Sequence, residues 1–302
     1  MVQATEILDQ FVELDGGLLV RAPAKLNLSL LVAGRRPDGY HQIKTVMAKV
    51  SLYDELTIRP MRSGRIELVC EGPYWAPQGP QNLVYRAANA FLKAADIGVG
   101  LHIRLRKYVA AGSGLGSASS DAAAVLLGLA RIFRSSRPCD LAVLAAEVGS
   151  DVAFFLGGPL SLCTGRGELV QPIPVRYQFL ALLIMPDVHV STVDVYASYV
   201  HQEDLYQGLD RRLSELLATG RVDQVSGPDM NMLAPICLRL HPDLAALKGR
   251  IEGLIGPVGI TGSGSGMFRL YDRQAICQAI ADHDLVIKNL GCTSMVVSSN
   301  PW

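Results

Sequence analysis

A glycine-rich stretch in the middle of the chain has the composition of an anion-binding loop. Glycines occupy positions 112, 114 and 116, and Ser119 and Ser120 follow just before an alanine-rich run. Apolar and polar residues alternate over 101–105, which predicts a strand ahead of the loop. A helix start presents unpaired backbone N–H groups at the positive end of its dipole, and glycine lets an anion approach closely. We therefore expect a nucleotide phosphate site here.

The same pattern also occurs in loops that bind nothing, so a purely structural role stays open at this point. No Gly-Lys-Ser/Thr sequence follows, which excludes the Walker A P-loop of nucleoside triphosphatases. The spacing also lacks the third glycine of a dinucleotide-binding fingerprint. A second glycine cluster at 261–266, containing Gly262, Ser263 and Gly264, favours the functional interpretation.

Two charged residues stand among apolar neighbours, and each has a structural as well as a chemical interpretation. Lys25, Asn27 and Ser29 alternate with leucines at 26, 28 and 30, which predicts a strand with one polar face, where a solvated lysine is ordinary. Asp151 directly precedes an apolar run and could simply cap the following helix. Taken singly, each residue is best interpreted as structural.

The elements that would position these residues follow from hydrophobic periodicity. A turn built on Pro37, Asp38 and Gly39 presents Tyr40 and His41. Strands are expected around 18–32, 45–50, 54–58, 101–105, 179–185, 267–270 and 290–297, and helices around 82–95, 119–133, 141–148, 191–196, 204–225 and 273–282. The prolines at 172 and 174 indicate a domain boundary.

The composition excludes several classes of protein. The 302 residues are 49% hydrophobic and 19% charged, which fits a folded chain of two domains. Basic and acidic residues number 28 each, so no bulk charge attracts nucleic acid or an anionic membrane. The cysteines at 70, 139, 163, 237, 277 and 292 form no C-x-x-C pair. We expect buried free thiols, neither signal peptide nor membrane span, and a cytoplasmic location.

Together these stretches resemble the GHMP kinase superfamily over about residues 22–297. The resemblance rests on three groups of residues: 22–28 with 36–41, 112–116 with 119–123, and 262–266. The stretches 149–152 and 165–168 add further matches. The resemblance implies an α+β fold. Residues 1–172 would form an ATP-binding domain like domain 2 of ribosomal protein S5, and residues 173–302 a ferredoxin-like domain, with the active site in the cleft between them.

The Pro-Asp-Gly-Tyr-His stretch narrows the resemblance to the branch that acts on a cytidyl substrate. It implies ATP-dependent phosphorylation of the C2 hydroxyl of 4-diphosphocytidyl-2-C-methyl-D-erythritol, a step toward isoprenoids. On this resemblance Asp151 is the catalytic base and Lys25 lies beside it. Asn27 holds the substrate hydroxyls, Tyr40 and Tyr196 stack on cytosine, and His41 bonds its edge.

The resemblance also implies a site for ATP and Mg²⁺. The ATP loop would comprise Ala110, Ala111, Gly112, Ser113, Gly114, Leu115, Gly116, Ser117, Ala118, Ser119 and Ser120, supported by the second loop at Gly262, Ser263 and Gly264. Ser119 or Ser120 is the candidate Mg²⁺ ligand. The family usually has glycines where this chain has Ser117 and Ala118, so their Cβ atoms would lie where the backbone approaches phosphate.

Two alternatives stay open. The chain could phosphorylate another small alcohol, such as homoserine or a mevalonate-type acid, although these carry no pyrimidine for Tyr40 and Tyr196 to stack on. It could also be a catalytically silent nucleotide-binding homologue. We expect a monomer or weak homodimer that binds a small molecule. The other histidines, at 102, 189, 201, 241 and 283, lack metal-ligand spacing.

Overall fold

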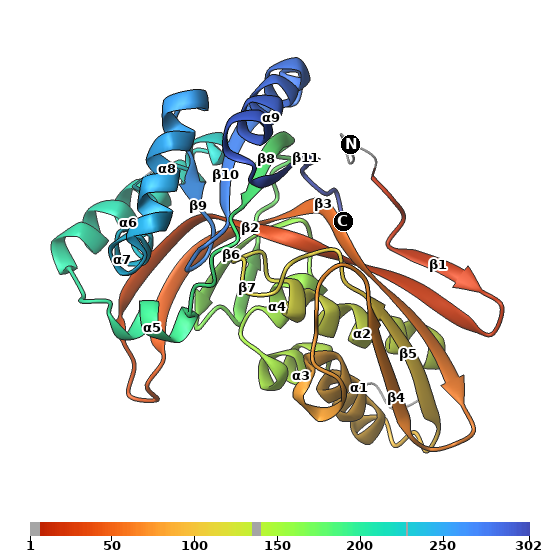
Figure 1. The fold of residues 1–302 in the computed structure, drawn as a ribbon. Helices are drawn as coiled ribbons and strands as arrows, with labels where there is room; N and C mark the ends of the chain where they lie inside the picture. The colour runs from red at the N-terminus through yellow and green to blue at the C-terminus, as the bar shows by residue number, and fades with distance from the viewer. Residues whose placement is uncertain (1–6, 135–139, 228) are drawn as a thin grey trace.

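Two β-sheets with helices packed on them form the protein (Figure 1). The computed structural model describes residues 7–134, 140–227 and 229–302. Cys139, one of the cysteines expected to be a free thiol, lies outside the described residues. No helix within these described ranges has the length and apolar composition needed to cross a bilayer.

The first sheet is built around a long antiparallel pair of strands. Its strands are β1 (Phe11–Leu14), β2 (Gly17–Arg35), β3 (His41–Met61), β4 (Ile66–Glu71), β5 (Gly100–Arg106), β6 (Leu160–Gly165) and β7 (Leu169–Pro172). They follow the order β1-β2-β3-β5-β4, and β6 pairs with both β3 and β7. One part of β3 pairs with β6 and another with β5.

The two strands predicted at 45–50 and 54–58 are therefore parts of one strand. The pairing of β2 with β3 shifts register between Pro23 and Ala24, which pair with Tyr53 and Val50. Such a bulge bends a strand without ending it. The long β2–β3 pair consequently contributes residues to both hydrophobic cores.

The second sheet lies in the C-terminal half and is antiparallel. Its strands are β8 (Phe179–Met185), β9 (Gly259–Ile260), β10 (Met267–Asp272) and β11 (Thr293–Ser298), in the order β11-β8-β10-β9. Every residue of the central strand β8 is buried, as its continuous apolar sequence predicts. The chain passes from the first sheet to the second between Pro172 and Phe179.

Helices cover the sheets and close the two cores. They are α1 (Leu83–Ala94), α2 (Ser117–Phe133), α3 (Leu141–Val148), α4 (Val152–Leu156), α5 (Thr192–Ala197), α6 (Glu203–Ala218), α7 (Ala234–Leu240), α8 (Pro242–Ile255) and α9 (Ile276–Leu290), with short 3₁₀ turns at Gly79–Gln81 and Val222–Gln224. One core joins α1–α4 to the first sheet, and the other surrounds the second sheet. Helix α2 packs closely because Gly128 faces Val20 and Ile58, where a Cβ would clash.

The described cysteines are all free thiols, as the sequence predicts. Cys163 and Cys237 are buried, whereas Cys277 is exposed on α9 and Cys70 and Cys292 are half-buried. The expectation that all are buried is therefore wrong for Cys277. It lies in the first turn of α9 and is exposed there.

Candidate active site

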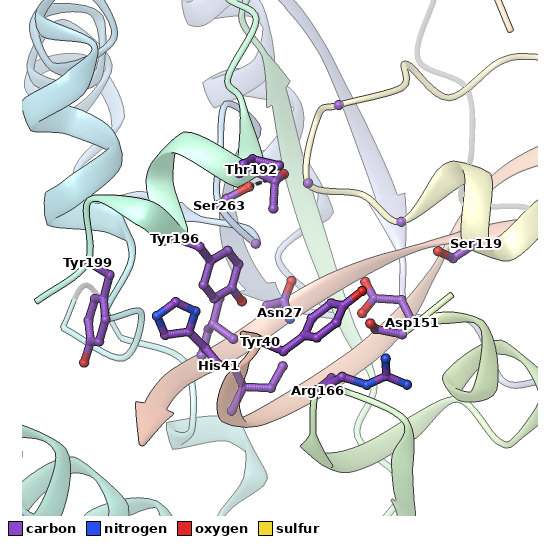
Figure 2. Close-up of a pocket in the computed structure, with 18 of the residues that line it drawn as sticks. Asn27, Tyr40, His41, Ser119, Asp151, Arg166, Thr192, Tyr196, Tyr199 and Ser263 are labelled. Carbon is purple, nitrogen blue, oxygen red and sulfur yellow. Dashed lines mark hydrogen bonds between the residues drawn. The ribbon is translucent and has the colours of Figure 1, made fainter. Parts of the chain in front are cut away.

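A cavity of about 770 Å³ gathers most of the residues singled out in the sequence (Figure 2). Its walls come from β2, the β2–β3 turn, both glycine loops, the start of α4 and helix α5. The predicted residues that line it are Lys25, Asn27, Tyr40, His41, Ala111, Gly112, Gly114, Gly116, Ser117, Ala118, Ser119, Asp151, Tyr196, Gly262 and Ser263. Segments more than 200 residues apart in sequence thus share one cavity.

Lys25 is a buried lysine in the wall of this cavity. Only 3% of the residue is exposed, and its Nζ donates to Asn27 Oδ1 and, at 2.6 Å, to the carbonyl of Gly114. The Asp151 Oδ2 atom lies 3.9 Å from Nζ. Burial lowers the pKa of Lys25, and the negative charge of Asp151 opposes part of that shift. The interpretation of Lys25 as a solvated strand residue is therefore excluded.

Asp151 occupies the N-cap position of α4, but its side chain accepts no capping hydrogen bond. The carboxylate instead faces Lys25 and remains partly open to the cavity, with 30% of its side chain exposed. A Cβ at Gly167 would lie 3.2 Å from Asp151 Oδ1, so the glycine of the Gly165–Gly167 turn leaves space for this carboxylate. A free carboxylate oxygen beside a lysine can accept a proton from a bound hydroxyl.

Asn27 connects the first sheet to the second glycine loop. Its backbone N–H donates to Thr261 Oγ1 at 3.0 Å, and its Nδ2 donates to Thr45 Oγ1 at 2.9 Å. The side-chain oxygen accepts the bond from Lys25. These contacts fix the amide in the cavity wall, where it also orients Lys25.

Each of the three glycines of the first loop is required, or tolerated, for a different structural reason. All three have positive φ, from +70° to +76°. A Cβ on Gly114 would overlap the Thr261 carbonyl of the second loop, and one on Gly116 would press on Lys25 and Phe155. Of the three, only Gly112 has room for a Cβ, which would make an ordinary contact with the His189 ring at 3.7 Å. Close packing therefore requires glycine at 114, against the second loop, and at 116, against Lys25 and Phe155.

Backbone and hydroxyl hydrogen bonds join the two loops directly. The Gly266 N–H donates to the Ser113 carbonyl at 3.2 Å, and Thr261 Oγ1 donates to the Gly114 carbonyl at 3.3 Å. Ser263 Oγ lies 2.9 Å from Thr192 Oγ1, which connects the second loop to α5. Gly264 packs on the Cys237 side chain and does not line the cavity.

The first turn of α2 is open to the cavity at its N-terminal end. Gly116 is the N-cap residue, and no side chain caps the helix there. The first hydrogen bond within the helix is the one that the Ser120 N–H donates to the Gly116 carbonyl. The N–H groups before Ser120 therefore have no partner within the helix. No acidic residue lies in this turn. The arrangement suits a bound anion.

The serines of the loop differ in burial. Ser119 is half-buried and lines the cavity, whereas Ser120 is 1% exposed and its buried hydroxyl has no hydrogen-bond partner among the described residues. Ser113 Oγ donates to the Ala110 carbonyl at 2.7 Å. Of the two candidate Mg²⁺ ligands, only Ser119 reaches the cavity.

Ser117 is turned inward, into a buried charged cluster beneath the loop. Its Oγ donates to Asp54 Oδ2 at 2.9 Å, and Lys107 Nζ contacts Ser117, Asp54 and Asp121. Asp54 Oδ1 accepts the N–H groups of Tyr108 and Val109. Burial, and then the nearby Asp54 charge, raise the pKa of Asp121. The Ser117 hydroxyl thus anchors the start of α2 and does not point into the cavity.

Aromatic side chains form the other end of the cavity (Figure 2). The His41 and Tyr196 ring centroids are 5.1 Å apart, and Tyr199 meets His41 edge-on at 5.9 Å. Burial, and then Arg35, lower the pKa of His41, and burial raises that of Tyr196. Tyr40 is 52% exposed at the rim. A flat heteroaromatic ring fits such a surface.

Two further cavity residues escaped the reasoning from sequence. Arg166 lies 4.9 Å from the centre of the Tyr40 ring and 3.8 Å from Glu168, and it lines the cavity near Asp151. In the sequence, Arg166 was only one position of the Gly165–Gly167 turn, with no functional role predicted for it. Tyr199, whose hydroxyl donates to the Val32 carbonyl at 3.0 Å, carried no signal beyond its spacing of three from Tyr196.

The described residues contain no group of three histidine, cysteine, aspartate or glutamate side chains able to hold a metal ion. Any Mg²⁺ would therefore need oxygen ligands from a bound nucleotide as well as from the protein.

Comparisons with known proteins agree with this geometry. Residues 82–158 match the family described as GHMP kinases N terminal domain. The chain is 36% identical to 4-diphosphocytidyl-2-C-methyl-D-erythritol kinase of Bacillus cytotoxicus, over 82% of this chain and 86% of that protein. It is also 36% identical to the kinase of the same name from Desulfitobacterium hafniense, over 86% and 89%.

Solved structures give the same result. A crystal structure of 4-(cytidine 5'-diphospho)-2C-methyl-D-erythritol kinase is 35% identical, has a TM-score of 0.72, and covers 94% of this chain and 100% of that one. Homoserine kinase from Cytophaga hutchinsonii, at 21% identity and a TM-score of 0.74, shares the fold over 97% of this chain and 98% of that one.

The fold and the paired glycine loops define a small-molecule kinase with an α+β architecture. The chain belongs to the GHMP kinase family, and its curated relatives place it among the 4-diphosphocytidyl-2-C-methyl-D-erythritol kinases of that family.

Proposed function

We propose that this enzyme transfers a phosphoryl group from ATP to the C2 hydroxyl of 4-diphosphocytidyl-2-C-methyl-D-erythritol, giving the 2-phosphate. One observation carries the proposal: a single cavity holds the Lys25–Asp151 pair, the open start of α2 and an aromatic surface around His41. The names of relatives at 36% identity support the same substrate.

We assign proton transfer to Asp151. Its carboxylate is partly open to the cavity and free of a capping bond, so it can accept the proton of the attacking hydroxyl. Lys25 Nζ lies 3.9 Å from Asp151 Oδ2, where it can hold the carboxylate in position beside the attacking hydroxyl. Asn27 keeps the lysine oriented and bonds the substrate hydroxyls from the cavity wall.

The residues at the start of α2 fit the phosphates of ATP. The unpaired N–H groups around Ser117 and Ala118 and the uncrowded backbone at Gly112 provide backbone contacts, and no acidic residue lies in the first turn of the helix. Ser119 would contribute a hydroxyl ligand to Mg²⁺, which when bound neutralises charge on the transferring phosphoryl group. Ser120 is too deeply buried for this role.

The aromatic end of the cavity would bind cytosine. Tyr196 and Tyr40 offer ring faces, and His41, with its lowered pKa, offers a neutral imidazole to the edge of the base. Arg166 lies 4.9 Å from the centre of the Tyr40 ring and lines the same cavity as Asp151, so it can bind the diphosphate of the substrate.

We propose a division into residues 1–172 and 173–302, with the cavity between the two parts. The change of sheet after Pro172 supports it, although β2 and β3 contribute to both hydrophobic cores. The cytoplasmic location and the monomer or weak homodimer expected from the sequence remain predictions.

The testing experiment measures ADP release with MgATP and three acceptors: the diphosphocytidyl substrate, homoserine and mevalonate. Turnover with the first acceptor only is expected. Asp151→Asn, which keeps the shape of the side chain, should reduce kcat by about 10²–10⁴-fold. Turnover with another alcohol would assign a different GHMP activity. ATP binding without any turnover would mark a silent homologue.

A further inference from the structure

A second buried lysine, Lys49, lies directly opposite Lys25 in the β2–β3 pair. The two residues are cross-strand partners, so their side chains leave the same face of the sheet. Only 1% of Lys49 is exposed, and it is among the largest fully buried side chains of the described residues. A buried lysine is costly unless its polar head has partners.

Those partners are the carbonyl groups at the C-terminal end of α4. The Lys49 Nζ donates to the Gly157 carbonyl at 2.7 Å and to the Phe155 carbonyl at 3.2 Å. Its backbone N–H also donates to the Pro159 carbonyl at 2.8 Å. The last carbonyls of a helix lack partners within the helix and lie at its negative end, so an amine satisfies them well.

Helix α4 is only five residues long, and Asp151 stands at its other end. The two adjacent lysines therefore contact opposite ends of one short helix: Lys25 faces the carboxylate and Lys49 holds the carbonyls. No carboxylate lies within ion-pairing distance of Lys49 in the described part of the chain. The hydrogen bonds of the Lys49 ammonium or amine group go to the backbone of α4, the helix that Asp151 precedes.

We propose that Lys49 is a positioning residue for phosphoryl transfer, fixing α4 so that the Asp151 carboxylate stays aligned with Lys25 and the substrate hydroxyl. The inference rests on the proposed function, because it assumes that Asp151 accepts the proton. Burial lowers the pKa of Lys49 to about 7. A neutral amine still donates both hydrogen bonds and does not repel the neighbouring Lys25.

The test compares Lys49→Met with Lys44→Met. Methionine keeps the length of the side chain but cannot donate. Lys44 is on the same strand and contacts Asp210 and Ser214 away from the cavity, so its variant controls for loss of a lysine. We expect kcat of Lys49→Met to fall about 10- to 100-fold while KM for both substrates changes little, and kcat of Lys44→Met to stay at the wild-type value.

A double-mutant cycle with Asp151→Asn separates positioning from general loss of structure. If Lys49 acts through the carboxylate, adding Lys49→Met to Asp151→Asn should change kcat by less than about twofold. Lys49→Arg keeps a hydrogen-bond donor and should retain more activity than Lys49→Met. If Lys49→Met does not fold, Lys49→Arg takes its place in the double-mutant cycle. Unchanged kcat in Lys49→Met, or equal losses with and without Asp151, would overturn the proposal. Absence of turnover in the wild-type enzyme would instead overturn the proposed function.

Discussion

The Cα of Gly114 packs against the carbonyl oxygen of Thr261, so closely that an added methyl group would overlap this oxygen. The contact joins the two glycine loops, which lie about 150 residues apart in sequence. It also places the Gly114 carbonyl where Lys25 Nζ donates to it at 2.6 Å. Loop packing and the orientation of the lysine are therefore one structural feature.

Gly114→Ala should lower the free energy of unfolding by roughly 2–4 kcal/mol, since it combines a strained φ with overpacking. Gly112→Ala has nearly the same φ, but its methyl group would make only an ordinary contact with His189, so a loss of about 1 kcal/mol is expected. Urea unfolding of both variants measures the difference. Equal losses would show that the loops do not pack as described.

Arg166→Gln should raise KM for the diphosphocytidyl substrate about tenfold, because a charge-assisted bond to the diphosphate is lost. Arg131→Gln is the matched control. Arg131 also lies over an aromatic ring, Phe11, and pairs with an acid, Glu13, but it is outside the cavity. Inhibition by cytidine should not change in Arg166→Gln, whereas inhibition by CDP should weaken. An equal effect on both inhibitors would show that Arg166 contacts the cytosine ring and not the diphosphate.

Ser119→Ala should increase the Mg²⁺ concentration needed for half-maximal activity, because the only candidate hydroxyl that reaches the cavity is removed. Ser120→Ala should leave this Mg²⁺ dependence unchanged. It should raise the free energy of unfolding by about 1 kcal/mol, since the buried hydroxyl has no partner. Titrations of activity with Mg²⁺ and urea unfolding distinguish the two variants; a shift in Mg²⁺ dependence for Ser120→Ala alone would reverse the assignment.

The buried Lys49 predicts a pH-dependent stability. Its pKa falls from 10.5 to about 7 on folding, so between these values the unfolded chain binds more protons than the native one. Its contribution therefore makes the free energy of unfolding rise with pH, by at most about 1.4 kcal/mol per unit, and become flat below pH 7. Lys49→Met should lack this slope. Urea unfolding at pH 6, 7.5 and 9 measures it, and parallel curves for the two proteins would contradict the prediction.

Much of the fold could be predicted from local patterns. The apolar run of β8 and the alternation around Lys25 both correspond to strands. Helix α2 begins at Ser117, two residues before the predicted start, because Ser117 and Ala118 already have helical geometry. The division of β3 into two strands was wrong, since a bulge breaks the pattern of side chains without ending the pairing.

The site could be predicted only as a set of residue types. The sequence by itself determined that glycine loops, a lysine, an aspartate and aromatic side chains were present, because spacing and residue type are local properties. The tertiary structure decided that Lys25 is buried, that Ser117 faces inward and that Lys49 lies beside Lys25. Burial, strand register and the packing of loops distant in the chain depend on long-range contacts, which no local pattern records.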